Sequence, residues 1–138
     1  MQRAIVGFGR DDQGDWVAHL ACGHPQHVRH DPPFFNRPWV ATRVGRAATL
    51  GRPLNCVRCE RLELPLAPRL RPAGPPVAFT ESTLPPALRD GRALGPATWG
   101  VIELTEGALR YRVDAWDVAL TLRPGTPGVL VPEVAARV

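Results

Sequence analysis

The stretches CGH at residues 22–24 and CVRC at residues 56–59 decide how the first part of this 138-residue chain folds. Together they hold all three cysteines of the sequence. Zinc takes four sulfur or nitrogen ligands in a tetrahedron, and three cysteines with one histidine are a common closed structural set. A glycine between the first cysteine and the histidine lets the backbone curl so that both side chains reach one ion. The spacing therefore predicts a structural Zn²⁺ site formed by Cys22, His24, Cys56 and Cys59.

The fourth ligand is less certain than the three cysteines, because His24, His27 and His30 recur at spacings of three. His24 is preferred because of the Gly23 turn, and His27 is the alternative ligand. His27 and His30 could instead form a second, open site for a metal or an anion, with Arg29 between them. We expect rather that they are hydrogen-bonding groups that fix the loop. A redox role for Cys56 and Cys59 is disfavoured, because no βαβ frame surrounds them.

Outward from the cysteines, the pattern predicts mainly short strands and loops. The apolar runs QRAIVGFG at 2–9 and WVAHLA at 16–21 flank an Asp/Gly turn and indicate a β-hairpin. Four prolines within residues 25–39 predict irregular backbone there. Residues 40–54 offer one strand or one helical turn.

The second half of the chain has a different residue pattern. Five prolines within residues 60–76 indicate a linker. Beyond it, strand-like runs at 98–104, 109–113, 118–122 and 129–131 alternate with Gly/Pro turns, which is typical of an antiparallel meander, barrel or sandwich. We therefore predict a mostly β protein with a zinc-binding domain at residues 1–62, a linker at 63–76 and a second β domain at 77–138.

The composition limits the possible cell compartments and the classes of partner. The 16 prolines and 13 glycines disfavour long helices. No apolar run approaches the ~18 residues that cross a bilayer, and the first residues lack a secretory signal. An odd number of cysteines, two of them in Cys-x-x-Cys, suits a metal site in a reducing compartment, so the expected location is the cytoplasm. The net charge of +4 is thinly spread and does not favour nucleic acid, although it leaves that partner open.

Arginines and aromatic residues are interleaved within residues 29–58. Such a pattern could form a surface for single-stranded nucleic acid. We expect instead that Phe34, Phe35 and Trp39 pack in the core while the arginines are solvated. Arg29 and Arg37 are the candidates for contacts with an anion or a partner.

Residues 3–60 resemble a family of small uncharacterised bacterial proteins that are sometimes labelled pressure-regulated proteins. The resemblance lies in GDW at 14–16, CGHPQHVRHDPP at 22–33, NRPWV at 36–40 and CVRC at 56–59. It implies a small zinc-binding domain without an assigned activity.

Residues 77–134 resemble the cupin-like domain of tellurite-resistance-like proteins. The matching stretches are FTESTLPPAL at 79–88, TWGVIELTEGALRYRV at 98–113 and LRPGTPGVLVPEV at 122–134. That family continues past the last stretch with a histidine and further strands. The resemblance thus implies an incomplete antiparallel cupin-like barrel with an open edge, which a second copy of the chain could cover.

The function expected from all this is that of a non-enzymatic zinc-binding protein. The resemblance links it to stress or to the response to tellurite and other oxyanions. One alternative is a nucleic-acid-binding zinc module, and another is a metal-dependent enzyme that uses the His27/His30 loop. The expected partners are a second copy of the chain, a small anion or another protein, with no membrane.

Overall fold

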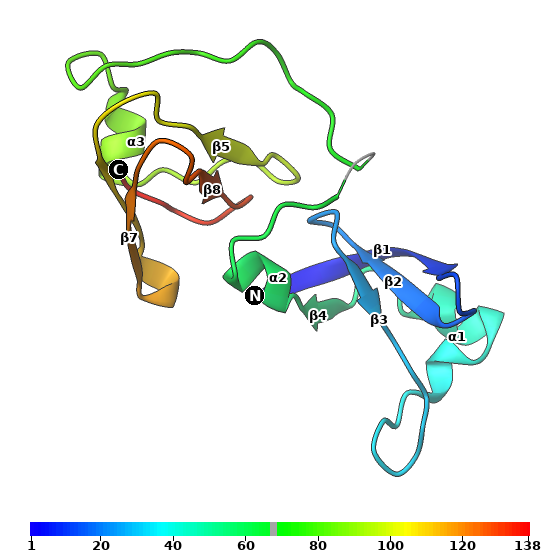
Figure 1. Cartoon of the computed structure of the whole chain (residues 1–138). Coiled ribbons are helices and arrows are strands. Elements are labelled where there is room, and N and C mark those ends of the chain that lie inside the picture. Colours follow the sequence, from blue (N-terminus) through cyan, green and yellow to red (C-terminus); the bar gives the residue numbers. More distant parts are fainter. Residues whose placement is uncertain (67–68) are drawn as a thin grey trace. The chain divides into compact units, whose positions relative to one another are not determined.

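The computed structural model describes residues 1–66 and 69–138, and residues 67 and 68 of the expected linker lie outside the described residues (Figure 1). The chain forms two compact units, Met1–Arg61 and Leu62–Val138. Strands outnumber helices in both, so the predicted mostly β fold is confirmed. In the part of the chain that the structure describes, no helix combines the length and the hydropathy needed to cross a membrane.

The first unit is built on one four-stranded sheet. The strand order is β3-β2-β1-β4, with every neighbouring pair antiparallel. The predicted hairpin is present, and its turn is closed by Asp11, whose carboxylate accepts hydrogen bonds from the backbone of Gln13 and Asp15. The strands are β1 (Gln2–Arg10), β2 (Trp16–Leu20), β3 (Pro25–His27) and β4 (Pro53–Asn55).

The expectation of irregular backbone throughout residues 25–39 is wrong at its beginning. Residues 25–27 form the edge strand β3, which pairs with β2. Proline is tolerated here because Pro25 is the first residue of an edge strand, where its missing N–H removes little from the ladder. The other prolines do break the strand pattern, and Pro38 begins the 3₁₀ helix η1 (Pro38–Val40).

Two short helices complete the first unit, α1 (Arg43–Ala48) and α2 (Val57–Glu60). Thr42 caps α1 by accepting a hydrogen bond from the Gly45 backbone at 3.0 Å. Glycine is required at position 45, because an added Cβ would lie 2.5 Å from the backbone oxygen of Trp39. Residues 40–54, where strand and helical turn were both open, contain α1 and the start of β4.

The buried apolar side chains of the first unit are small. Among the described residues they are chiefly aliphatic, and they include Ile5, Val17, Leu20 and Val28. Two of the three aromatic side chains expected in the core lie outside it, since Phe34 is 83% exposed and Phe35 is 51% exposed. The third, Trp39, is half-buried and its ring packs against that of Phe8. A unit of this size with so few large buried groups needs a further source of stability, such as a metal.

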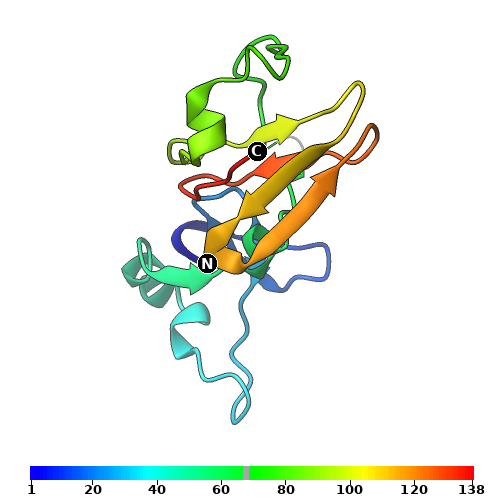
Figure 2. The ribbon, with the colours of Figure 1, turned by 90° about the vertical axis from the view of Figure 1, so that its left-hand side faces the viewer.

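The second unit consists of two antiparallel strand pairs, β6 with β7 and β5 with β8 (Figure 2). The expected antiparallel arrangement is confirmed, as two pairs rather than one continuous sheet in the part that the structure describes. The elements are α3 (Pro86–Asp90), β5 (Gly100–Ile102), β6 (Leu109–Val113), η2 (Asp114–Trp116), β7 (Val118–Leu122) and β8 (Gly128–Leu130).

Tyr111 lies at the centre of the second unit and is fully buried. Its hydroxyl donates a hydrogen bond to the backbone oxygen of Val129 at 2.6 Å, which links β6 to β8. Burial raises the pKa of Tyr111 to about 12, because the charged phenolate would be cut off from water. Tyr111 therefore joins the two strand pairs both by packing and by a buried hydrogen bond.

Candidate metal centre

Two neighbouring segments of the first unit supply the clustered cysteines and histidine. Cys22 and His24 lie in the turn between β2 and β3, where Gly23 adopts a φ of 89° that favours glycine. The turn is closed by hydrogen bonds from the Gly23 backbone to Leu20 and from the Leu20 backbone to His24. The side chains of the cluster thus start from a well-defined turn.

The other two side chains come from the end of β4 and from α2. Cys56 is the residue before α2, and Cys59 lies within it. The backbone N–H of Cys56 donates to the Met1 carbonyl at 2.7 Å, which ties this segment to the start of β1. Since β1 pairs with both β2 and β4, the sheet brings together segments 34 residues apart in the sequence.

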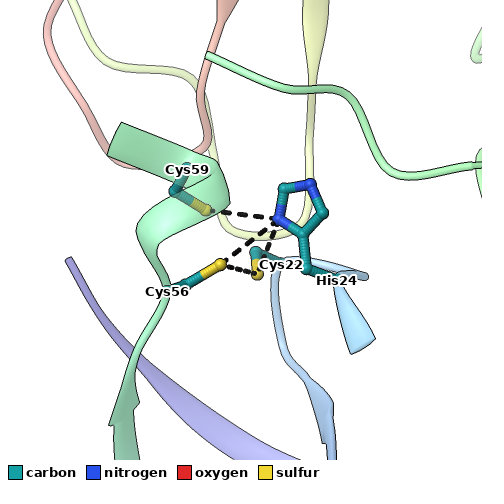
Figure 3. Close-up of side chains that lie close together, drawn as sticks. All are labelled: Cys22, His24, Cys56 and Cys59. Atoms are coloured by element: carbon teal, nitrogen blue, oxygen red, sulfur yellow. Dashed lines mark hydrogen bonds between the residues drawn. The ribbon is translucent and has the colours of Figure 1, made fainter. Parts of the chain in front are cut away.

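Figure 3 shows the three sulfur atoms grouped around Nδ1 of His24. This nitrogen lies 3.5 Å from the sulfur of Cys22, 3.4 Å from that of Cys56 and 3.6 Å from that of Cys59. The sulfurs of Cys22 and Cys56 lie 3.8 Å apart, and all four ligand atoms lie within 4.8 Å of one another. All four residues are buried.

These distances can be compared with those of a tetrahedral zinc site. With Zn–S near 2.3 Å and Zn–N near 2.05 Å, tetrahedral geometry places two sulfurs about 3.8 Å apart and a sulfur and a nitrogen about 3.6 Å apart. The sulfur–sulfur separation of Cys22 and Cys56 and the three sulfur–nitrogen separations agree with these values, and the cysteines are free thiols rather than a disulfide. The cluster therefore fits a tetrahedral ion and could hold a metal.

The three thiols shift one another's pKa values. A hydrogen bond with Cys59 lowers the pKa of Cys22 to about 5. The same hydrogen bond, with burial, raises the pKa of Cys59, and burial raises that of Cys56. The protein alone thus favours a thiolate at Cys22 and neutral thiols at Cys56 and Cys59. A divalent cation at the centre would stabilise all three thiolates, which is the state that binds metal.

A buried arginine lies beside the cluster. Arg3 on β1 is only 4% exposed, and its hydrogen bond to Cys59 lowers the pKa of that thiol against the larger opposing effects. Three thiolates, a neutral histidine and a divalent ion carry a net charge of −1, so the guanidinium offsets that charge. Sequence reasoning did not single out Arg3, because nothing in its position on an apolar strand signals a sulfur partner.

Two family models match the chain. Residues 6–63 match the model described as protein of unknown function (DUF3565), and residues 76–138 match the TehB-like domain. Both resemblances expected from the sequence are thereby confirmed. No curated protein and no solved structure matches the chain.

The other predicted site residues of the DUF3565 region lie in different surroundings. Nε2 of His27 lies 2.8 Å from the carboxylate of Asp11, whose pKa this hydrogen bond lowers. Nδ1 of His30 accepts a hydrogen bond from the backbone of Arg37. Among the described residues, neither His27 nor His30 belongs to a group of three or more metal-ligating side chains.

Arg29 and Arg37 were candidates for anion or partner contacts. The Arg29 guanidinium pairs with the Asp15 carboxylate at 3.0 Å. The Arg37 side chain instead lines a cleft on the sheet of the DUF3565 region. The structure thus separates two arginines that the sequence pattern grouped together.

Replacing one histidine at a time by alanine tests which histidine is the fourth ligand. We expect His24→Ala to weaken zinc affinity by more than about 100-fold, the upper range for losing a group that only supports a ligand. His27→Ala should leave the affinity within about threefold, since His27 contacts Asp11 instead of the cluster. Competition with a chromophoric zinc chelator measures both values. A large loss of zinc affinity in His27→Ala, together with tight zinc binding by His24→Ala, would contradict the assignment of His24 as the fourth ligand.

Proposed function

We propose that the DUF3565 region is a zinc-stabilised binding module, in which Zn²⁺ held by Cys22, His24, Cys56 and Cys59 closes the fold. The observation that carries the proposal is the agreement of the sulfur–sulfur and sulfur–nitrogen distances with a tetrahedral zinc site. Sulfur and imidazole ligands in a tetrahedron favour zinc over the harder divalent ions, which prefer oxygen.

The role proposed for the ion is structural rather than catalytic. Catalytic zinc keeps one coordination position open for water or substrate, whereas structural zinc is enclosed by four protein ligands. Here four ligands are provided, and each is at most 3% exposed. Reduced thiols are required for binding, so the protein is expected to work in the cytoplasm.

Elemental analysis of protein purified without added metal tests this proposal. We expect close to one zinc per chain in the wild-type protein. Cys59→Ser is the matched control, because it changes one sulfur to oxygen at a ligand position and should lower the zinc content below about a tenth. A wild-type protein that is folded yet holds less than a tenth of one zinc would refute the proposal.

The TehB-like region suggests a second copy of the chain as partner. In the described residues, β7 pairs with β6 on one side only, and its sequence VALTL has no charge or proline to deter pairing. Leu120 on this strand is 47% exposed. Such an edge accepts another strand readily. Native mass spectrometry of the samples used for elemental analysis gives the number of chains in each assembly. A monomer at micromolar concentration would contradict this dimer.

A further inference from the structure

The net positive charge of the protein arises from the first unit alone. Residues 1–61 contain nine arginines and five acidic residues, whereas residues 62–138 contain eight of each. Within residues 32–59 there are five arginines and no acidic residue. A stretch of this composition attracts a polyanion, since no carboxylate within it competes for the guanidinium groups.

Two of these arginines line a cleft of about 320 Å³, a size suited to a small ligand or one unit of a polymer. The walls include the side chains of Ile5 and Leu54, with Trp39 and the two arginines Arg37 and Arg52. Among the described residues, no carboxylate lines this cleft or pairs with either guanidinium. The cleft therefore presents two available cations beside an aromatic ring and apolar walls.

An aromatic loop leads directly into the cleft. Phe34 is 83% exposed and Phe35 is 51% exposed, and they lie three and two residues before Arg37, respectively. The loop has a fixed shape, because the backbones of Asp31 and Phe35 exchange two hydrogen bonds of 2.8 Å (between β3 and α1 in Figure 1). Two exposed rings in the segment that runs on to Arg37 of the cleft indicate an interaction surface.

We propose that this surface binds single-stranded nucleic acid, with one nucleotide unit in the cleft. Arg37 and Arg52 contact its phosphate, and Trp39 lies against its base. Phe34 and Phe35 stack on bases of the neighbouring units, a contact that works for every base because each has a flat face. An inorganic anion would satisfy the arginines but would leave the rings exposed. An acidic peptide would likewise lack the flat groups.

The test uses zinc-loaded full-length protein and a fluorescein-labelled ten-nucleotide oligothymidylate. Fluorescence anisotropy over a range of potassium chloride concentrations gives the affinity and its salt dependence. Removing both guanidinium groups from this one phosphate in R37M/R52M should weaken binding at least about tenfold at low salt and reduce the slope of log affinity against log salt by about 0.7. F34S/F35S should weaken binding at least about fivefold with the slope retained.

The matched control is R43M/R61M. It removes the same charge from the same unit, at two exposed arginines that do not line the cleft. We expect less than a threefold change and an unaltered slope. Zinc content measured on every variant shows that each one is folded, and it also separates a failure here from a failure of the zinc proposal.

Competition identifies what is recognised. Unlabelled oligothymidylate should displace the probe, and thymidine monophosphate should do so far less well, because it offers one phosphate and one base. Inorganic phosphate and polyglutamate should be the weakest competitors. The proposal is overturned by an absence of binding at low salt, by equal effects of the two arginine pairs, or by phosphate, polyglutamate or the mononucleotide competing as well as the decamer.

Discussion

Replacing Cys59 by serine is expected to unfold the Met1–Arg61 unit. Structural zinc contributes an apparent free energy of about 10–16 kcal/mol in small zinc domains, which is as large as the ~5–15 kcal/mol by which whole domains are usually stable. The aliphatic core around Ile5 and Leu20 is too small to replace that contribution. Treating the wild-type protein with a strong zinc chelator should have the same effect, because it removes the ion without changing any side chain.

Indole N–H signals in a ¹H–¹⁵N spectrum resolve this unfolding by unit. The chain has four tryptophans, of which Trp16 and Trp39 lie in the first unit and Trp99 and Trp116 in the second. In Cys59→Ser we expect the first two signals to move to unfolded positions while the other two stay dispersed. His30→Ala, at an exposed histidine, should keep all four. Four dispersed signals in metal-free Cys59→Ser would contradict the prediction.

Replacing Tyr111 by alanine should have the second largest effect, in the other unit. Removing a buried aromatic ring costs about 3–5 kcal/mol, and the Val129 carbonyl also loses its donor. We expect the indole signals of Trp99 and Trp116 to collapse. Zinc content should remain close to one per chain, since the cluster lies in a different compact unit.

Comparing the wild-type protein with Tyr111→Phe isolates the contribution of the hydroxyl group to stability, because the variant keeps the ring. Because the folded-state pKa of about 12 is above the ordinary value of 10.0, the stabilisation is complete below pH 10 and is lost as the pH rises towards 12. The loss in the free energy of unfolding is roughly 3 kcal/mol over these two pH units. Urea unfolding from pH 9 to 12 measures it.

Tyr111 is the single tyrosine of the chain, so tyrosinate absorbance follows its titration without interference from another phenol. Tyr111→Phe should have a flat stability profile over the same pH range. An equal decline in wild type and Tyr111→Phe would show that another group causes it.

The sequence was most informative where residue type and spacing alone determine the structure. Cys56 and Cys59 have two residues between them, a spacing that lets both sulfurs reach one ion. The strands at 109–113 and 118–122 were also predicted with the bounds that the structure has, because their apolar residues recur with a period of two and Gly/Pro turns flank the outer end of each. Local chemistry was sufficient in these cases.

The features that the sequence did not predict depend on contacts between distant segments. His24 and His27 are equally suitable donors, and only the pairing of β2 with β3 shows that one faces the cysteines while the other contacts Asp11. Phe34 and Phe35 have the composition of core residues, yet their loop projects from the sheet and leaves both exposed. Arg3 was missed because a buried cation on an apolar strand has no local sequence signal.

The cluster joins segments that are 34 residues apart in the chain, so the four ligands meet only after the sheet has formed. An unfolded chain cannot offer them together, and the ion is released on unfolding. The stability of the first unit then rises by about 1.4 kcal/mol for each tenfold increase in free zinc above the dissociation constant. With zinc as the proposed ion, a melting temperature measured for this unit is expected to depend on the free zinc concentration as well as on the sequence. Cells with little free zinc would hold the same polypeptide with its first sixty residues open to proteases.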